Sequence, residues 1–69
     1  MDKTDRDVLE AYVDKHQLTG VLEALIEICQ DKSIHIAENW QDATLARTWI
    51  RAARRIDRLA ILLKEQAVL

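Results

Sequence analysis

The chain has 69 residues, of which 49% are hydrophobic and 32% charged, and its formal net charge is −2. This apolar fraction excludes a disordered chain, and the single Cys29 excludes an internal disulfide framework. No apolar run approaches the ~18 residues of a membrane span, and no signal peptide pattern opens the chain, so we expect a cytoplasmic protein that does not bind membranes. With no proline and one glycine, residues 1–69 are predicted to form one all-helical domain.

The first predicted helix covers about residues 5–16. Thr4 followed by Asp7 has the spacing of a capping box, with Asp in place of the usual Glu. Apolar residues then recur at one-turn intervals, which predicts a short amphipathic helix. The 17–20 stretch interrupts this pattern, and Gly20 can adopt any strained backbone angle that a corner requires.

The second predicted helix covers about residues 20–38. Its apolar stripe has a 4-3-4-3-4 spacing, typical of a helix packed against others along its length. One stripe position is occupied by Lys32, which we expect either to contact Trp49 through a cation–π interaction or to extend its ammonium group to the rim. The stripe consists of Leu18, Leu22, Leu25, Cys29, Lys32 and Ile36.

The third predicted helix covers about residues 41–66, after a break near Asn39–Asp42. Its apolar positions follow a strict heptad spacing of 3-4-3-4-3-4. Trp40, at the connection, is expected either to staple the loop by packing or to stand exposed as an interface anchor, and we favour the staple. The heptad positions are Ala46, Trp49, Ala53, Ile56, Ala60, Leu63 and Ala67, flanked by Leu45, Ala52 and Leu59.

Two long helices joined by a tight connection must lie antiparallel, so the sequence predicts a short N-terminal helix followed by a helical hairpin. A chain of this size needs help to be stable, and its apolar residues occupy more than the one seam that a hairpin has. We therefore expect the hairpin to pair with a second copy in a dimeric helical bundle. The candidate interface residues, away from the main stripe, are Ile50, Ile61, Leu62 and Val68.

The near-neutral total charge hides a separation along the chain. The net charge is −2 over residues 1–18, −3 over residues 19–41 and +3 over residues 42–69. Five arginines share one arc of the third helix and four acidic residues share the outward arc of the second. These sets are an Arg face of Arg47, Arg51, Arg54, Arg55 and Arg58, and an acidic face of Glu23, Glu27, Asp31 and Glu38.

Three interpretations of these charged faces stay open. They can be solvated surfaces that keep a small protein soluble. The Arg face can dock onto an acidic surface of a protein or a nucleic acid, because the guanidinium group binds carboxylate and phosphate in a bidentate way. Alternatively, the acidic face of one molecule meets the Arg face of another.

No residue pattern indicates catalysis or a cofactor. Asp31, His35 and Glu38 lie one turn apart, but the two carboxylates point outward with the acidic face, so we predict no metal site. Cys29 sits within an apolar stripe without a neighbouring base, which is typical of a structural cysteine. We therefore expect neither an enzyme nor a cofactor-binding protein.

The sequence favours a non-catalytic protein–protein interaction module that acts as a homo-oligomer, as an adaptor, inhibitor or regulator of a larger protein. The alternative is a helical bundle that binds nucleic acid, RNA rather than DNA, through the Arg face. Against the alternative stands an isoelectric point of about 5.6, since nucleic-acid-binding domains typically exceed ~9.

Overall fold

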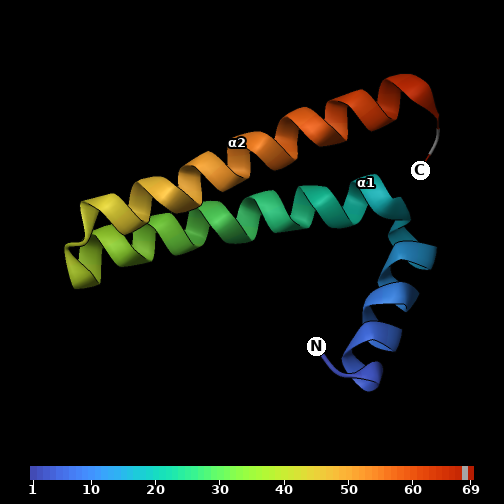
Figure 1. Ribbon diagram of the computed structural model, residues 1–69, viewed down its shortest axis with the longest axis horizontal. Helices are drawn as coiled ribbons and strands as arrows, with labels where there is room; N and C mark the ends of the chain where they lie inside the picture. The colour runs from blue at the N-terminus through green and yellow to red at the C-terminus, as the bar shows by residue number, and fades with distance from the viewer. Residues whose placement is uncertain (68) are drawn as a thin grey trace.

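The computed structural model describes residues 1–67 and 69, and it contains two long helices that lie side by side. Helix α1 (Lys3–His35) is followed by a five-residue π-helix, η1 (Ile36–Trp40), and by helix α2 (Ala43–Gln66). From residue 18 onward α1 runs antiparallel to α2, with η1 at the closed end (Figure 1). The part of the chain that the structure describes has no strand, which confirms an all-α helical hairpin.

The short N-terminal helix predicted over residues 5–16 is not confirmed as a separate element. Residues 3–16 are helical but belong to α1, which is kinked at the single residue Gln17 instead of being broken by a four-residue loop. Gln17 has φ 67° and ψ 162°, outside the helical region, and the chain turns there. Residues 3–16 therefore point away from the hairpin (Figure 1). We call residues 3–16 the arm and Gln17 the elbow.

Both long helices are capped by an aspartate at the N-terminus. The Asp2 carboxylate accepts a hydrogen bond from the Asp5 amide at 2.8 Å, so α1 begins earlier than the predicted Thr4 cap allows. The Asp42 carboxylate accepts from the Leu45 amide at 2.9 Å and caps α2. In each case the carboxylate satisfies an amide that has no partner within the helix.

The closed end of the hairpin is held by polar contacts. Gln41 takes a left-handed conformation (φ 55°, ψ 30°), which reverses the chain after η1. The Asn39 side-chain amide donates to the His35 carbonyl at 3.0 Å, and the buried Ser33 hydroxyl donates across the hairpin to the Ala46 carbonyl at 2.8 Å. Helix α1, which contains the second predicted helix, ends at His35 and continues as η1, instead of running as one α-helix to residue 38.

The elbow predicts a stabilising substitution. A residue with a side chain costs about 1–3 kcal/mol at the dihedral angles of Gln17, which are nearly specific to glycine. Gln17→Gly removes this strain but raises the conformational entropy of the unfolded chain, which offsets about 0.4–1 kcal/mol of the gain. We therefore expect a net increase of about 1 kcal/mol in the free energy of unfolding. Chemical denaturation at a fixed protein concentration measures the change.

Gln30→Gly is the matched control, because Gln30 is an exposed glutamine inside a regular part of α1. It should lose about 1 kcal/mol through helix propensity alone. A loss of equal size for Gln17→Gly would mean that residue 17 is helical in solution and that the elbow does not form.

Candidate interaction surfaces

The interior of the hairpin is built from small side chains. The buried apolar residues are Cys29, Ile36, Ala46, Ala53 and Ala60. No large side chain among the described residues is less than 2% exposed. The three alanines are seven residues apart on α2 and let the two backbones approach closely. Many of the larger apolar side chains are consequently left more than a third exposed to solvent.

One face of the hairpin is identified by a shallow hollow between the helices. Ile26 and Gln30 of α1 line it together with Ile50 and Asp57 of α2. The ion pair between Lys64 and Glu23 joins the two helices near the elbow end. We call this side, which is mostly hydrophilic, the polar face.

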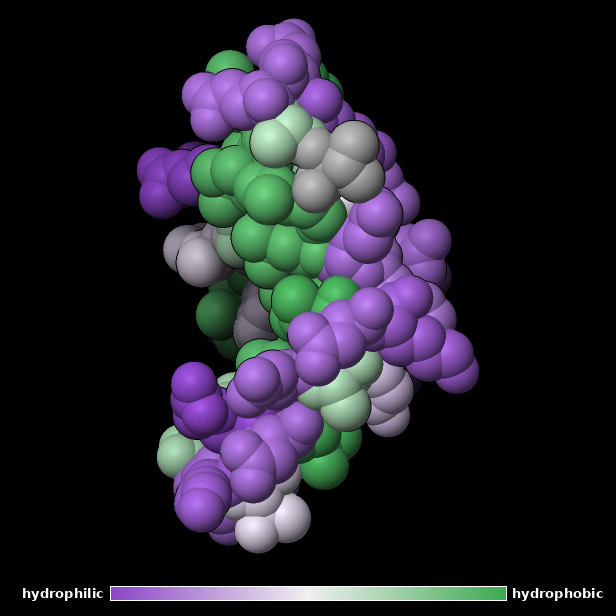
Figure 2. All heavy atoms as spheres, turned by 90° about the vertical axis from the view of Figure 1, so that its right-hand side faces the viewer, coloured by the Kyte–Doolittle hydropathy of each residue, from purple (hydrophilic) through white to green (hydrophobic). Residues whose placement is uncertain are grey.

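The opposite side carries large apolar residues from both helices. Successive side chains of an α-helix are 100° apart around its axis, so these apolar side chains point roughly 100° to 180° away from the side chains that line the polar hollow. Leu25, Ile28, Leu45 and Leu59 are 37–49% exposed. Figure 2, which views the elbow end of the molecule, shows apolar side chains gathered at the centre and left and hydrophilic residues along the right. We call this side the apolar face, and it comprises Val21, Leu25, Ile28, Leu45, Ala52 and Leu59.

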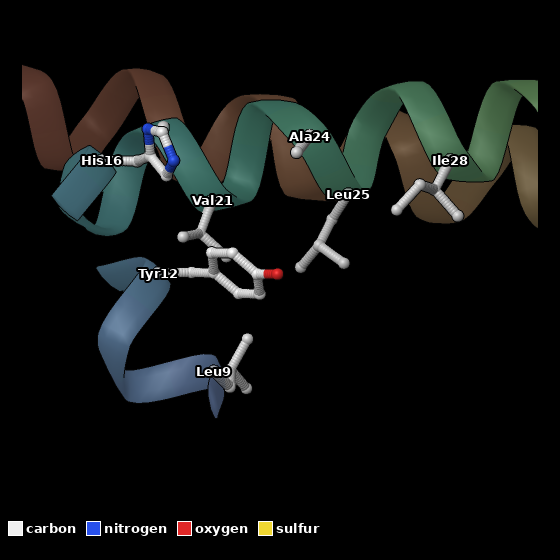
Figure 3. Close-up of a pocket in the computed structure, with 8 residues that line it drawn as sticks. Leu9, Tyr12, His16, Val21, Ala24, Leu25 and Ile28 are labelled. Atoms are coloured by element: carbon white, nitrogen blue, oxygen red, sulfur yellow. The ribbon is translucent and has the colours of Figure 1, made fainter. Parts of the chain in front are cut away.

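The arm extends the apolar face into a groove. Leu9 and Tyr12 of the arm face Val21, Leu25 and Ile28 of α1 across an open space of 510 Å³. Figure 3 shows the Tyr12 ring beneath Val21 and Leu25, with the Ile28 side chain pointing into the open side. The groove is lined almost entirely by apolar atoms, so it suits another apolar side chain better than a polar small molecule.

The Arg face lies along the exposed side of α2. All five of its arginines are exposed, and the stripe from Arg47 to Arg58 is about 16 Å long at 1.5 Å per residue. Within the described residues, ion pairs are formed by Arg6 with Glu10 and by Lys64 with Glu23, and none by the Arg face. Its guanidinium groups are thus available to an external anion.

The acidic face lies on α1 and on η1. Glu27, Asp31 and Glu38 are exposed, and Glu23 forms the ion pair with Lys64. The two charged faces therefore do not neutralise each other within one chain. They belong to helices of opposite net charge: α1 has seven acidic and four basic residues (−3), and α2 has two acidic and six basic residues (+4).

Three of the predicted interface residues, Ile50, Ile61 and Leu62, do not lie on the apolar face. Ile50 is half-buried beside the hollow of the polar face, while Ile61 and Leu62 are exposed elsewhere on α2. Val68 lies outside the described residues. Leu45 and Leu59, which flank the heptad positions, were not among the predicted interface residues, although both are exposed on the apolar face. The signal was the width of the apolar stripe, which exceeds what one neighbouring helix can cover.

The three predicted anchors have different surroundings. Trp40 is 67% exposed and contacts the His35 ring edge-on at a centroid distance of 6.4 Å, which does not fit a packed loop staple. Trp49 is half-buried. Lys32 is exposed next to Ile28, and no cation–π pair with Trp49 occurs in the described chain.

The remaining chemistry-bearing groups do not form a cluster. Cys29 is a buried free thiol. In residues 1–67 and 69, no three His, Cys, Asp or Glu side chains are grouped so that they could hold a metal ion. None of the helices described is long and apolar enough to cross a membrane.

Comparison with known proteins does not add a relative to this description. No family model matches the chain, and no curated protein or solved structure was found to be similar to it. Inferences about function therefore depend on the surfaces described above.

Proposed function

We propose that this chain is a non-catalytic helical interaction module that pairs with a second copy through the apolar face and docks, as a dimer, onto a larger protein. The observation that carries the proposal is the division of its apolar residues. Small side chains fill the hairpin seam, whereas leucines and isoleucines cover one side of it. A contiguous exposed apolar face is typical of a protein–protein interface.

The surface area supports pairing with an equal partner. The chain exposes 5572 Å², whereas a folded monomer of 8.0 kDa is expected to expose about 4,450 Å². The excess of about 1,100 Å² is comparable to the ~800 Å² that each partner buries in a standard interface. The radius of gyration of 14.0 Å likewise exceeds the ~11 Å of a compact chain of this length.

Sedimentation over a range of concentrations tests the dimer. We expect a species of about twice the 8.0 kDa chain mass at micromolar concentration, which dissociates on dilution. A species of single chain mass throughout this range would contradict the proposal. The single buried thiol of Cys29 suits a reducing compartment, which supports placing the module in the cytoplasm.

The exposed Arg face, which forms no ion pair within the described residues, supports a second candidate function, the binding of structured RNA. If all five arginines contact phosphates, the logarithm of the binding constant should fall with the logarithm of salt concentration at a slope of about −4. Arg51→Gln combined with Arg55→Gln should weaken binding and reduce the slope by about 2. Fluorescence anisotropy with a labelled RNA hairpin measures both effects.

Arg6→Gln is the control for the RNA experiment, because Arg6 lies on the arm and pairs with Glu10 at 3.7 Å. It should leave the affinity and the salt slope unchanged. Equal losses for Arg6→Gln and the double variant would indicate a nonspecific charge effect, and no binding at low salt would dispose of the RNA function.

A further inference from the structure

The elbow is flanked by a hydrogen bond to the C-terminal residue and by a close approach between the arm and the hairpin. The Thr19 amide donates to the Leu69 carbonyl at 2.8 Å, which ties the chain beside the elbow to the C-terminal residue. A β-carbon at position 20 would lie 3.2 Å from the His16 β-carbon, so Gly20 permits this close approach. Tyr12 stacks on His16 at a centroid distance of 6.4 Å. A strained residue such as Gln17 persists only when its surroundings determine its conformation, so we expect the groove to be present before any partner binds.

The groove has the chemistry of a helix-binding site. Its two walls, the arm and the part of α1 that follows the elbow, present apolar side chains at helical spacing. Leu25 and Ile28 belong to both the groove and the apolar face. An amphipathic helix laid along the apolar face would thus project side chains into the groove. The arm would then enclose that helix from the side opposite to α2.

Net charge indicates which helix of a second copy would occupy this position. A two-fold axis parallel to the hairpin places α2 of one copy on α1 of the other, so that the +4 helix faces the −3 helix twice. A two-fold axis across the hairpin would place like-charged helices on each other. Electrostatic complementarity therefore favours α2 on α1.

The position of each residue along the hairpin axis, called its level, indicates which side chain of the second copy lies at the groove. The bond between Ser33 and Ala46, and the hollow shared by Ile26 and Ala53, show that residue numbers at one level add to about 79. A parallel two-fold axis preserves these levels, so residues 20–28 of α1 lie level with residues 51–59 of the second copy. Leu59, 47% exposed on the apolar face, is in this range.

We propose that the arm and the rest of α1 clasp helix α2 of a second copy, and that Leu59 of that copy occupies the groove at the level of Gly20 and Val21, facing Leu9. This inference rests on the proposed dimer and adds its arrangement. It assigns the arm a role as a clamp, and it makes the groove complete only in the dimer.

Charged substitutions in the arm test the clamp. Leu9→Glu places a carboxylate in the groove and should raise the dissociation constant of the dimer about tenfold or more. Val8→Glu is the matched control, since Val8 is an exposed apolar residue next in sequence that does not line the groove, and it should stay within about twofold of the wild type. Sedimentation measures the dissociation constants, and far-UV circular dichroism checks that each variant is folded.

The outcomes separate the clamp from the dimer itself. A dimer that Leu9→Glu does not weaken would overturn the clamp and leave the proposed function standing. A wild-type monomer would overturn both. Equal weakening by Val8→Glu and Leu9→Glu would also count against the groove, because a general charge effect of the arm would explain it.

Disulfide trapping tests which helix enters the groove. In a Cys29→Ala background, chains with Leu9→Cys are mixed with chains with Leu59→Cys and oxidised. We expect a mixed covalent dimer, since a disulfide requires α-carbons within about 7 Å. Val8→Cys in place of Leu9→Cys should give little of it. Efficient trapping of Leu9→Cys chains with one another, without Leu59→Cys, would show two arms in contact and overturn the assignment of α2.

Discussion

Ile28→Glu is expected to convert the dimer to a monomer at micromolar concentration. Ile28 is 49% exposed at the centre of the apolar face and points into the groove (Figure 3). Burying such a side chain at an interface contributes about 2 kcal/mol, and a two-fold dimer loses this contribution twice. The resulting loss of about 4 kcal/mol raises the dissociation constant about a thousandfold, before the cost of desolvating two carboxylates is counted. Sedimentation velocity at several concentrations measures the change.

Ile34→Glu is the matched control for this variant. Ile34 is an isoleucine on the same helix and is similarly exposed, at 55%, but it lies among the residues of the acidic face. The same substitution there should leave the dissociation constant within about threefold of the wild type. If both variants dissociate the dimer equally, the interface is not confined to the apolar face, and if neither does, the apolar face is not the interface.

Ala53→Leu is expected to have the largest effect on the fold itself. Ala53 is 3% exposed in the seam where α1 and α2 approach each other, and the hollow beside it is shallow, so a larger side chain presses against the facing helix. Overpacking of this kind costs about 1–3 kcal/mol, which for a chain of this size corresponds to a decrease of roughly 10 °C in Tm. Thermal unfolding at one fixed protein concentration measures it, because dimerisation makes Tm depend on concentration.

Ala43→Leu provides the comparison for the seam. Ala43 is exposed at the first turn of α2, so the added side chain extends into solvent. Its Tm should stay within about 3 °C of the wild type. A Tm for Ala53→Leu that is equally unaffected would show that the two helices are not in close contact at this point.

Much of the hairpin was predictable because helical periodicity is a local property. The heptad spacing of alanines and larger residues over 41–66 predicted a helix packed along its length, and α2 covers Ala43–Gln66. The end of the other hairpin helix was predicted less well, because the change to the wider turns of η1 leaves no mark in the spacing of apolar residues. A helix break near residues 17–20 was also predicted. The residue that takes the unusual dihedral angles is Gln17 and not Gly20, since that choice depends on contacts between His16, Gly20 and the C-terminal chain.

The surfaces were predicted in part. The Arg face and the acidic face followed from charge and periodicity alone. A helix that packs through one apolar stripe exposes the charged side chains that lie outside this stripe. The interface residues were harder to predict, because an apolar residue is equally compatible with an internal seam and an open face. Leu45 and Leu59 flank the heptad positions, and only their position relative to α1 shows that they remain exposed.

The sequence by itself therefore determined the helical content, the antiparallel hairpin and the separation of charge between its two long helices, since each follows from spacing along one helix. Only the tertiary structure decided which apolar residues are left uncovered, where the arm points and what groove it forms. These features depend on the close approach that the small residues of α2 permit and on the angle at Gln17, and both arise from contacts between segments that are distant along the chain.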